Sequence, residues 1–491
     1  MKLLWTRRLV QLLFLALWIF LFLAARSPLS QVMRTDLYLL TDPLVALAAL
    51  GAAQVLVASL LAAGLLLAAT LVLGRFFCGW ICPLGTLLDG AAKVLRPPEQ
   101  RFSAKTHRAM LRWKYWILVF VLAAAVMSFQ LAWLLDPLVL LGRASASALY
   151  PAATAVLPAD WLPDGLGQSA HPVLWAPLLV LLAVLGLTAL APRFFCRYLC
   201  PLGALYALAA RLPLLRRRVR DCDGCAGVDT SRRCAAACRM GAIPANPRHS
   251  RSAECIRCMQ CRRLCHAGAI RFSWGAPLPD RRDEPLDVTR RGFLAAGATG
   301  LLLAPVLARG TAARGNPERV VRPPRVVDEE LFLDQCVRCG LCVQACPTQT
   351  LQLTGLEAGA AGLWSPAITP RIAGCQPECN DCALVCPTEA IPPFTTRLED
   401  KWATKMGTAQ FESTRCICYT EGAGCARCIR VCPTRAIVID TSPGRHPMRP
   451  ARVDLFRCVG CGLCEHTCRE VVFGQPALTT WAHGRGDPAH F

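Results

Sequence analysis

The cysteines constrain this chain more than any other feature. Twenty-nine of the 491 residues are cysteine, and nearly all of them fall into short, repeated spacings. Three groups follow the unbroken spacing C-x2-C-x2-C-x3-C: Cys255, Cys258, Cys261 and Cys265; Cys336, Cys339, Cys342 and Cys346; and Cys458, Cys461, Cys464 and Cys468. Three further groups contain one longer interval: Cys222, Cys225, Cys234 and Cys238; Cys375, Cys379, Cys382 and Cys386; and Cys418, Cys425, Cys428 and Cys432.

The unbroken spacing is the ligand pattern of [4Fe-4S] clusters in bacterial ferredoxins, where the fourth cysteine usually binds the partner cluster. Structural zinc normally uses two separated pairs of ligands, and disulfide frameworks belong to small secreted domains, so both alternatives fit less well. The strings CRMGAI, CHAGAI, CPTEAI and CPTRAI follow four of the groups, which marks the groups as internal copies of one half-module. The sequence therefore predicts six [4Fe-4S] clusters.

One group leaves its first ligand open. Cys416 lies two residues before Cys418, and either thiol could be the first ligand of the group that continues with Cys425. We expect Cys418 to be the ligand and Cys416 to be the remainder. The pairing of the four motifs after residue 330 is also open, because the spacing fits either neighbours or the first motif with the fourth.

The first part of the chain is apolar. Long hydrophobic runs occupy residues 9–25, 44–73, 115–135 and 173–191. Each is near or above the ~20 residues that cross a bilayer core, so the pattern predicts four membrane helices. The predicted fold class is an α-helical membrane domain of four helices plus a short fifth, joined to α+β bacterial-ferredoxin-like [4Fe-4S] modules.

Basic residues set the expected orientation. They gather before the first run, at 93–114 between the second and third runs, and at 211–220 after the fourth. The positive-inside rule then places the N-terminus and the segment after residue 211 in the cytoplasm. The net charge of +21 follows largely from this bias, so we do not interpret it as a sign of nucleic-acid binding.

A second repeat lies inside the apolar part. The string RFFCGWICPLG at 75–85 recurs as RFFCRYLCPLG at 193–203. Two thiols from each copy, brought together by pseudo-symmetry, would supply four ligands. Cys78, Cys82, Cys196 and Cys200 are therefore a candidate for a seventh cluster. The alternative is two redox-active or structural thiol pairs.

The segment from Thr289 to Leu294 reads TRRGFL and precedes a weakly apolar stretch, which is typical of a twin-arginine export signal. The alternatives are a short fifth membrane helix or a cytoplasmic linker. An export signal and a fifth membrane helix both place the residues after 310 in the periplasm. The expected domains are 1–212 (membrane domain), 213–288 (cytoplasmic ferredoxin pair), 289–310 (signal or fifth helix), 311–327 (linker) and 328–491 (periplasmic polyferredoxin with four clusters).

With these motifs, residues up to ~285 resemble the NapH-type membrane polyferredoxins, and residues from ~287 resemble the NapG-type periplasmic polyferredoxins. The chain looks like a fusion of the two, and it shares parts with methylamine-utilisation ferredoxins and with the NosR and RdxA/CcoG types. It departs from the pattern in the long interval after Cys225 and in the missing proline after Cys265.

The resemblance implies that quinone is the substrate, and that electrons pass from the quinol pool to a periplasmic reductase, commonly through a c-type cytochrome. It also implies a multi-pass protein of the bacterial inner membrane. The alternatives are a maturation factor that reduces metals or thiols, and a redox sensor. The chain has neither a CxxCH haem motif nor a dinucleotide-binding GxGxxG motif, and we predict no catalytic residues.

Overall fold

The structure is a computed structural model, and it describes residues 2–26, 29, 34–54, 61–97, 102–156, 174–211, 213–220, 233–244, 246–265, 268–275, 289–312, 317–440, 449–472 and 474–489. The chain divides into two compact units. Unit 1 comprises Met1–Phe22, Leu37–Ala144 and Ala176–Pro305, and unit 2 comprises Leu23–Asp36, Ser145–Trp175 and Val306–Phe491.

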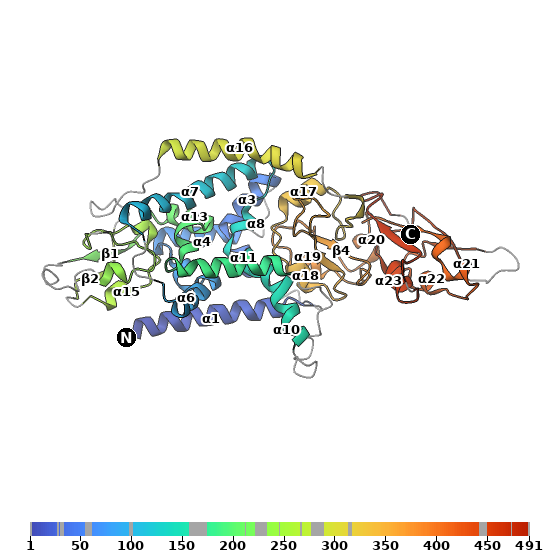
Figure 1. Ribbon diagram of the computed structural model, residues 1–491, viewed down its shortest axis with the longest axis horizontal. Helices are drawn as coiled ribbons and strands as arrows, with labels where there is room; N and C mark the ends of the chain where they lie inside the picture. The colour runs from blue at the N-terminus through green and yellow to red at the C-terminus, as the bar shows by residue number, and fades with distance from the viewer. Residues whose placement is uncertain are drawn as a thin grey trace. The chain divides into compact units, whose positions relative to one another are not determined.

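Unit 1 is mainly helical (Figure 1). Its helices are α1 (Lys2–Ala24, which runs on into unit 2), α2 (Leu37–Leu40), α3 (Pro43–Ala53), α4 (Leu61–Leu73), α5 (Phe76–Trp80), α6 (Pro83–Leu95), α7 (Ala104–Val126), α8 (Ala132–Leu135), α9 (Pro137–Ala144), α11 (Trp175–Gly186), α12 (Phe194–Tyr198), α13 (Pro201–Ala209), α14 (Arg233–Ala236), α15 (Gln260–Arg263) and α16 (Arg290–Ala312). Helices α3, α6 and α13 begin with proline directly after a capping Asp or Cys, which satisfies their first free N–H groups.

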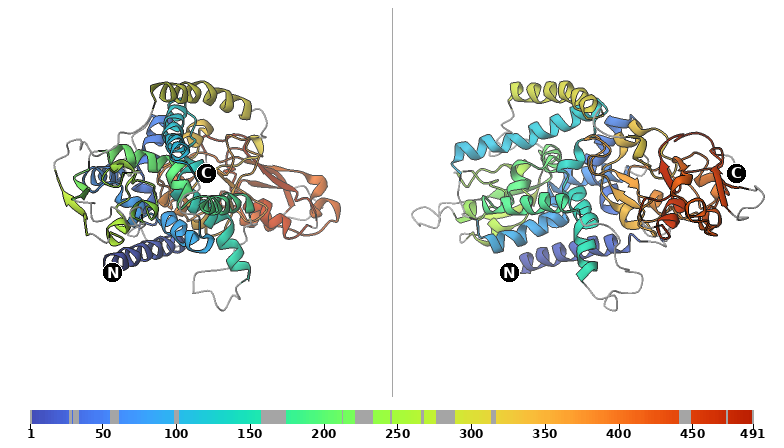
Figure 2. Two further views of the ribbon diagram at one scale, coloured as in Figure 1. Left: turned by 60° about the vertical axis from the view of Figure 1, so that its left-hand side comes forward. Right: turned by 45° about the vertical axis from the view of Figure 1, so that its right-hand side comes forward.

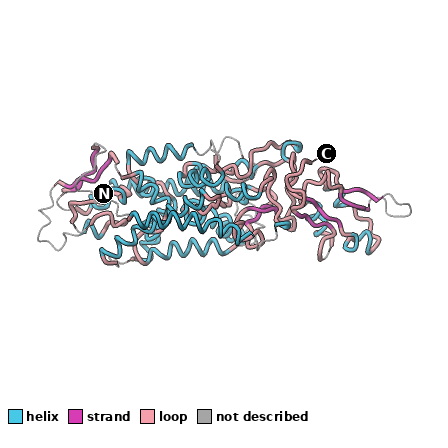
Figure 3. Tube along the Cα trace, turned by 90° about the horizontal axis from the view of Figure 1, so that it is seen from above, coloured by secondary structure: helices cyan, strands magenta, loops and turns pink. Residues whose placement is uncertain are grey.

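Unit 2 consists largely of loops and short helices, as the tube in Figure 3 shows. Besides α10 (Tyr150–Val156), its helices are α17 (Glu329–Gln335), α18 (Leu341–Ala345), α19 (Asp381–Leu384), α20 (Leu398–Lys401), α21 (Ile417–Thr420), α22 (Arg427–Val431) and α23 (Leu463–Arg469). Its largest core gathers cysteines with Phe332, Trp402 and Met406. So little regular structure leaves the cysteine-bearing loops as the main architectural elements of this unit.

The strands form four antiparallel pairs among the described residues. In unit 1, β1 (Leu215–Val219) pairs with β2 (Ile270–Trp274), so the two strands enclose the first ferredoxin pair in sequence. In unit 2 the pairs are β3 (Leu351–Leu353) with β4 (Pro366–Ile368), β5 (Thr408–Phe411) with β8 (Leu478–Trp481), and β6 (Ile437–Asp440) with β7 (Arg449–Val453). These short antiparallel pairs support the expected ferredoxin-like modules.

The expected membrane domain of four helices plus a fifth is wrong. Among the described residues only two helical stretches, Trp5–Ala24 and Lys105–Val126, are long and apolar enough to cross a membrane. The run 44–73 does not form one helix, because α3 ends at Ala53, Gln54 turns left-handed with a φ of 55°, and α4 has 13 residues. Thirteen residues span about 20 Å, against the ~30 Å of a hydrocarbon core.

The other two expected spans fail for related reasons. The run 173–191 yields a 12-residue helix, α11, followed by a 3-10 turn at Leu187–Ala189. Helix α16 has 23 residues but is not among the helices apolar enough to span a membrane. Apolar length in the sequence therefore overstated the number of continuous helices, since part of this surface is buried inside unit 1.

Helix α16 packs along α7 through its glycines, and Figure 2 shows the two helices side by side (yellow-green and cyan). A Cβ atom on Gly300 would lie 2.7 Å from the carbonyl oxygen of Phe120 and 2.9 Å from the Cβ of Ala123. Gly292 lies in the same way against the indole of Trp116. Small residues thus allow the backbones of α16 and α7 to approach closely.

This packing predicts the effect of a single methyl group. Gly300→Ala is expected to destabilise the protein by ~1–3 kcal/mol, because the added Cβ overpacks the contact with α7. Gly64→Ala in α4 is the matched control, since nothing lies within 4 Å of its added Cβ. It should stabilise the helix by about 1 kcal/mol through propensity alone. Urea unfolding in detergent measures both, and equal effects would contradict the close approach.

Candidate iron–sulfur centres

The cysteine loops share one backbone conformation. In the three unbroken motifs, the second and fourth residues after the first cysteine have left-handed φ angles between 53° and 81°: Arg257 and Met259, Arg338 and Gly340, and Gly460 and Gly462. The third residue after the last cysteine of five motifs is also left-handed: Gly241, Gly268, Gln349, Glu389 and Arg435. Left-handed residues within such loops turn successive N–H groups inward, which creates a concave site for an anionic group.

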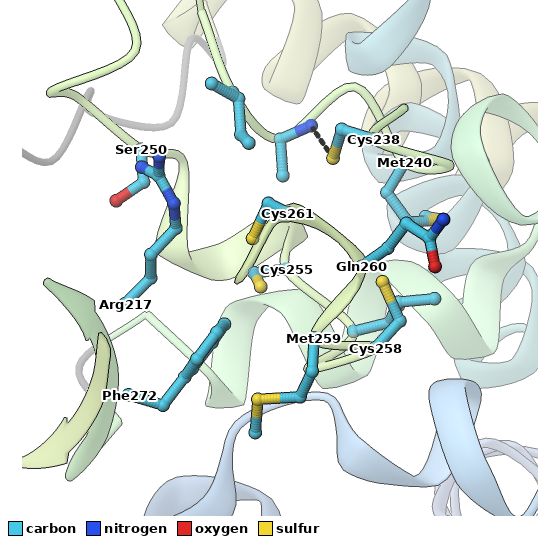
Figure 4. A pocket seen from close by; sticks show the side chains of 13 residues that line it. Arg217, Cys238, Met240, Ser250, Cys255, Cys258, Met259, Gln260, Cys261 and Phe272 are labelled. Atoms are coloured by element: carbon cyan, nitrogen blue, oxygen red, sulfur yellow. Dashed lines mark hydrogen bonds between the residues drawn. The ribbon is translucent and has the colours of Figure 1, made fainter. Parts of the chain in front are cut away.

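The ferredoxin pair of unit 1 exchanges a cysteine between its motifs. Cys255, Cys258 and Cys261 line one cavity together with Cys238, the fourth cysteine of the preceding motif (Figure 4). The sulfur of Cys238 accepts a hydrogen bond from the N–H of Ala242 at 3.3 Å. Three thiols from one loop and a fourth from the other motif match the ligand set of a cubane in a two-cluster ferredoxin.

The partner centre of this pair is only partly described. Cys222 and Cys225 lie outside the described residues. Cys234 and Cys265, the two other expected ligands, pack against the same small core as Cys238 and Cys261. The two described thiols of this site therefore lie beside the same core as the neighbouring four-thiol set.

Unit 2 repeats the exchange twice. Four-thiol sets line two cavities: Cys346 with Cys375, Cys379 and Cys382; and Cys432 with Cys458, Cys461 and Cys464. Cys346 and Cys432 are each the fourth cysteine of the preceding motif, and the other three thiols of each set belong to the next motif. The motifs are therefore paired as neighbours along the chain, which answers the question that the spacing left open.

The remaining thiols of each pair of motifs also lie near one another, with the fourth cysteine now coming from the later motif. Burial, together with the charge of Cys336, raises the pKa of Cys386 to about 11. Burial likewise raises the pKa of Cys428 to about 12, with added effects from the thiols of Cys468, Cys416 and Cys425. Each expected cluster in unit 2 thus has four thiols close enough to influence one another. Among the described residues, no group of three or more His, Cys, Asp or Glu side chains is arranged to hold a single metal ion.

Backbone N–H groups point at the cysteine sulfurs. The hydrogen bonds run from Ile391 to Cys386 (3.5 Å), from Ala436 to Cys432 (3.2 Å), from Ala477 to Cys468 (3.3 Å) and from Ala409 to Cys458 (3.3 Å). Such bonds favour the thiolate form and are one of the means by which a protein sets the potential of a cluster. The donors fit an anionic cluster better than a set of neutral thiols.

The structure favours Cys416 over Cys418 as the first ligand of its motif. Cys255, Cys336 and Cys416 each follow a helical turn and have an extended backbone, with ψ between 113° and 122°. Cys418 instead lies within α21, and its sulfur donates a hydrogen bond to the carbonyl oxygen of Cys425 at 3.1 Å. Cys416 therefore has the geometry of a first ligand, in contrast to our expectation from the spacing.

Cysteine-to-serine variants test this assignment. Cys416→Ser is expected to lose one cluster, about four irons per chain, because three thiols hold a cubane poorly. Cys418→Ser, two residues away, is the matched control and should keep the full iron content. Iron and acid-labile sulfide analysis of the purified proteins measures both. Iron loss in Cys418→Ser alone would reverse the assignment.

The two CxxxCP repeats build a further four-thiol group, which we call the four-cysteine site (Cys78, Cys82, Cys196 and Cys200). Each repeat folds into a five-residue helix, α5 or α12, and its second cysteine caps the next helix, α6 or α13. Burial raises the pKa of Cys82 and Cys200 well above the usual value, and the thiols of Cys196 and Cys78 raise both further. The four thiols therefore lie close together.

Two buried arginines face the four-cysteine site. Arg75 and Arg193 open the two repeats, and neither side chain reaches solvent. Nε and Nη2 of Arg75 have no hydrogen-bond partner, although Nη2 lies 2.9 Å from the Cβ position of Gly203, which is itself 3.4 Å from the sulfur of Cys200. A cubane with four thiolate ligands carries net negative charge, so these unpaired donors fit a cluster bound at this site.

Two buried carboxylates join the arginines to the adjacent ferredoxin loops, and no motif in the sequence predicted these contacts. Glu254, directly before Cys255, accepts hydrogen bonds from Arg75 (2.8 Å), Lys114 and Tyr115 (2.5 Å). Burial alone would raise the pKa of Glu254, but the charges of Lys114 and Arg75 hold it at about 2. The only advance hint was that an arginine occupies the same position in both repeats.

Asp89 plays the corresponding part for the second repeat. It binds Arg193 through two hydrogen bonds of 2.7 and 2.9 Å, and it also contacts Arg7 (2.8 Å) and Arg239 (2.6 Å). Arg239 directly follows Cys238, so this carboxylate reaches the exchanged cysteine of the ferredoxin pair. Each repeat is thus tied by a buried ion pair to one side of the same ferredoxin site.

Removing one of these carboxylates should be costly. Glu254→Gln leaves Arg75 and Lys114 buried without a counter-charge, and we expect a loss of ~3–5 kcal/mol in the free energy of unfolding. Glu412→Gln is the control, because Glu412 forms an exposed pair with Arg415 that is worth ~0–1 kcal/mol. Urea unfolding followed by tryptophan fluorescence compares the two. Similar losses would argue against a structural role for the buried network.

Comparisons with known families agree with the cysteine sites. Models described as 4Fe-4S binding domain match residues 55–100 with 173–220, and residues 330–352, while a 4Fe-4S dicluster domain matches 421–471. The first match contains all four thiols of the four-cysteine site. No solved structure matches the chain.

Curated relatives match over most of their own length. The methylamine utilization ferredoxin-type protein MauM of Paracoccus denitrificans is 39% identical over 166 residues, 33% of this chain and 70% of MauM. The ferredoxin-type protein NapG of Escherichia coli is 36% identical over 213 residues, 41% of this chain and 85% of NapG. The ferredoxin-type protein NapH of Haemophilus influenzae is 29% identical over 290 residues, 55% of this chain and 90% of NapH.

Proposed function

This chain belongs to the family of ferredoxin-type iron–sulfur proteins that includes NapG and MauM, and on that premise we propose that it carries electrons from quinol to a periplasmic acceptor. Its length of 491 residues fits a fusion of NapG-like and NapH-like sequences. The single observation that supports the proposal most is the exchange of cysteines between neighbouring motifs, because it places successive one-electron centres within a few residues of each other.

The proposed cofactors are six [4Fe-4S] clusters in the ferredoxin motifs and a seventh in the four-cysteine site. When bound, such clusters accept and release single electrons. The protein contributes thiolate ligands, N–H donors to sulfur and the burial that excludes water. Cys416 replaces Cys418 in the ligand set that we expected from the sequence.

The four-cysteine site is the proposed entry to the chain of clusters. The loop between Cys78 and Cys82 lies directly against the loop between Cys255 and Cys258: the indole N–H of Trp80 donates to the carbonyl oxygen of Arg257 at 3.1 Å. Gly79 packs on the backbone of Ile256 so closely that a side chain would not fit. A cluster in the four-cysteine site would therefore have the ferredoxin site as its neighbour, with backbone atoms in van der Waals contact between them.

The proposed location is the bacterial inner membrane. The two apolar stretches Trp5–Ala24 and Lys105–Val126 and the likeness to NapH support attachment to a membrane. The paired arginines Arg290 and Arg291 support export of the following residues by the twin-arginine route, which carries folded, cluster-bearing domains. We propose that residues 328–491 lie in the periplasm, where a c-type cytochrome or a reductase accepts the electrons.

A two-residue variant tests the entry site. Cys78→Ser with Cys196→Ser should lower the iron content by about four atoms per chain and abolish quinol-dependent reduction of the other clusters. The visible absorbance of membranes, recorded after adding a quinol analogue under anaerobic conditions, measures the reduction. Cys418→Ser should behave like wild type.

Two outcomes would contradict the proposal. Unchanged iron content in the double variant would remove the seventh cluster. Wild-type membranes that reduce none of the clusters with quinol, yet reduce all of them with dithionite, would remove quinol as the donor and favour a role in metal or thiol reduction during maturation.

A further inference from the structure

Two aspartates occupy matching places in unit 1. The string Asp-Pro-Leu-Val occurs at 42–45 and again at 136–139, and each copy starts a helix, α3 or α9. Oδ1 of Asp42 accepts hydrogen bonds from the N–H groups of Leu44 and Val45, and Oδ1 of Asp136 accepts them from Leu138 and Val139. One oxygen of each carboxylate is therefore occupied by helix capping.

The other oxygen of each carboxylate has no such donor. Asp42 is 1% exposed and Asp136 is 0% exposed, and Oδ2 has no hydrogen-bond partner in either residue. The two side chains are nevertheless close enough to hydrogen-bond to each other when one is protonated. Two ionised carboxylates can only accept, so the buried pair is satisfied only when a proton lies between the free oxygens.

Few neighbouring side chains could donate a hydrogen bond to the free oxygens of Asp42 and Asp136 in place of this proton. Arg143 on α9 interacts with Asp136, but its Nη1 also donates to the carbonyl oxygen of Trp133 at 3.1 Å. The buried hydroxyl of Tyr206 on α13 has no hydrogen-bond partner. Tyr38 on α2 donates its hydroxyl to the carbonyl oxygen of Phe14.

The remaining charges nearby are already engaged. Asp89 on α6 is bound by arginines, and Lys114 and Tyr115 on α7 bind Glu254. Helices α4 and α8 carry no charged residue. Arg143 is thus the one fixed cation that the described residues place beside the pair, and it balances one of the two carboxylate charges. The second charge is left for a proton to neutralise.

The pair adjoins the four-cysteine site. The ring of Tyr206 packs against Phe77, the neighbour of Cys78, with ring centroids 5.4 Å apart. Helix α13, which carries Tyr206 and begins after the capping Cys200, packs on α3, which begins after Asp42. Burial raises the pKa of Tyr206 well above its usual value, and the charges of Asp42, Cys78 and Cys82 add to the rise. Burial also raises the pKa of Asp42 well above its usual range and that of Asp136 to about 6. Burial therefore favours the protonated form of both carboxyls over what an exposed aspartate would show.

We propose that Asp42 and Asp136 form a proton-binding site that takes up one proton when the cluster in the four-cysteine site gains one electron. The electron would come from quinol, whose oxidation releases two electrons and two protons. One electron would enter the four-cysteine site and pass to the next cluster before the second follows. For each electron one of the two released protons would bind the aspartate pair, and it would leave to solvent when that electron moves on. The negative charge that such a cluster would gain on reduction would favour a second proton on Asp42 and Asp136, and the pair would release that proton once the electron has passed on. The inference rests on the cluster proposed above.

Infrared spectroscopy of the resting full-length protein tests the shared proton without relying on activity. The C=O band of a protonated, buried carboxyl should be present at pH 7 in wild type and absent in Asp42→Asn. Asparagine keeps the helix cap and can donate to Asp136, so this variant should fold. Glu399→Gln removes an exposed carboxyl and should leave the band unchanged.

Redox titration monitored by electron paramagnetic resonance tests the coupling. The resonance signal that wild type shows and the double variant Cys78→Ser, Cys196→Ser lacks is assigned to the cluster in the four-cysteine site. Its midpoint potential should rise as pH falls from 8 to 5 in wild type, and this dependence should be lost in Asp42→Asn and in Asp136→Asn.

The outcomes separate the two proposals. If wild type lacks the resonance signal assigned to the four-cysteine site, both the seventh cluster and the proposed function are contradicted. A signal whose potential is independent of pH in wild type overturns the proton-binding site alone, as does a potential that follows sodium concentration instead of pH. No carboxyl band at pH 7 would also overturn it.

Discussion

Unit 1 depends on charge balance inside a dry core. Arg75 and Arg193 are completely buried beside four thiols, and each is held by a carboxylate, Glu254 or Asp89, that also contacts a ferredoxin loop. Buried ion pairs are stabilising only when their geometry and hydrogen bonds repay desolvation. Here the same ion pairs also fix the distance between two cysteine sites, so one set of contacts serves both folding and the placement of the redox centres.

The second constraint is the exchange of cysteines between neighbouring motifs. Because Cys238, Cys346 and Cys432 each leave their own motif to join the next one, neither half of a pair can complete its ligand set alone. Modules of this size bury little apolar surface, and metal ligation is expected to supply much of their folding free energy. The left-handed residues at fixed positions, such as Arg257 and Arg338, carry backbone strain that the rest of the loop must compensate.

Local spacing identified 4Fe-4S motifs, which the family models also recognise, but apolar length was a poor guide to the helices. The motifs could be recognised because three of the four ligands of a ferredoxin cubane come from one short loop, whereas the fourth comes from another motif. Continuous membrane helices could not be recognised in this way, since hydropathy does not reveal that the backbone breaks at Gln54 or that α11 ends at Gly186. The choice between Cys416 and Cys418 also required the structure, because the spacing fits both and only the backbone before each residue distinguishes them.

The sequence alone determined the chemistry of this protein: repeated thiols at ferredoxin spacing, two CxxxCP repeats and a likeness to NapG-type and NapH-type proteins. Those features follow from ligand geometry, which is encoded within a few residues. Only the tertiary structure decided which motifs pair and which carboxylates balance the buried arginines. It alone showed that Asp42 and Asp136, 94 residues apart in the chain, face each other. Such contacts arise from packing between distant segments, and no local pattern records them.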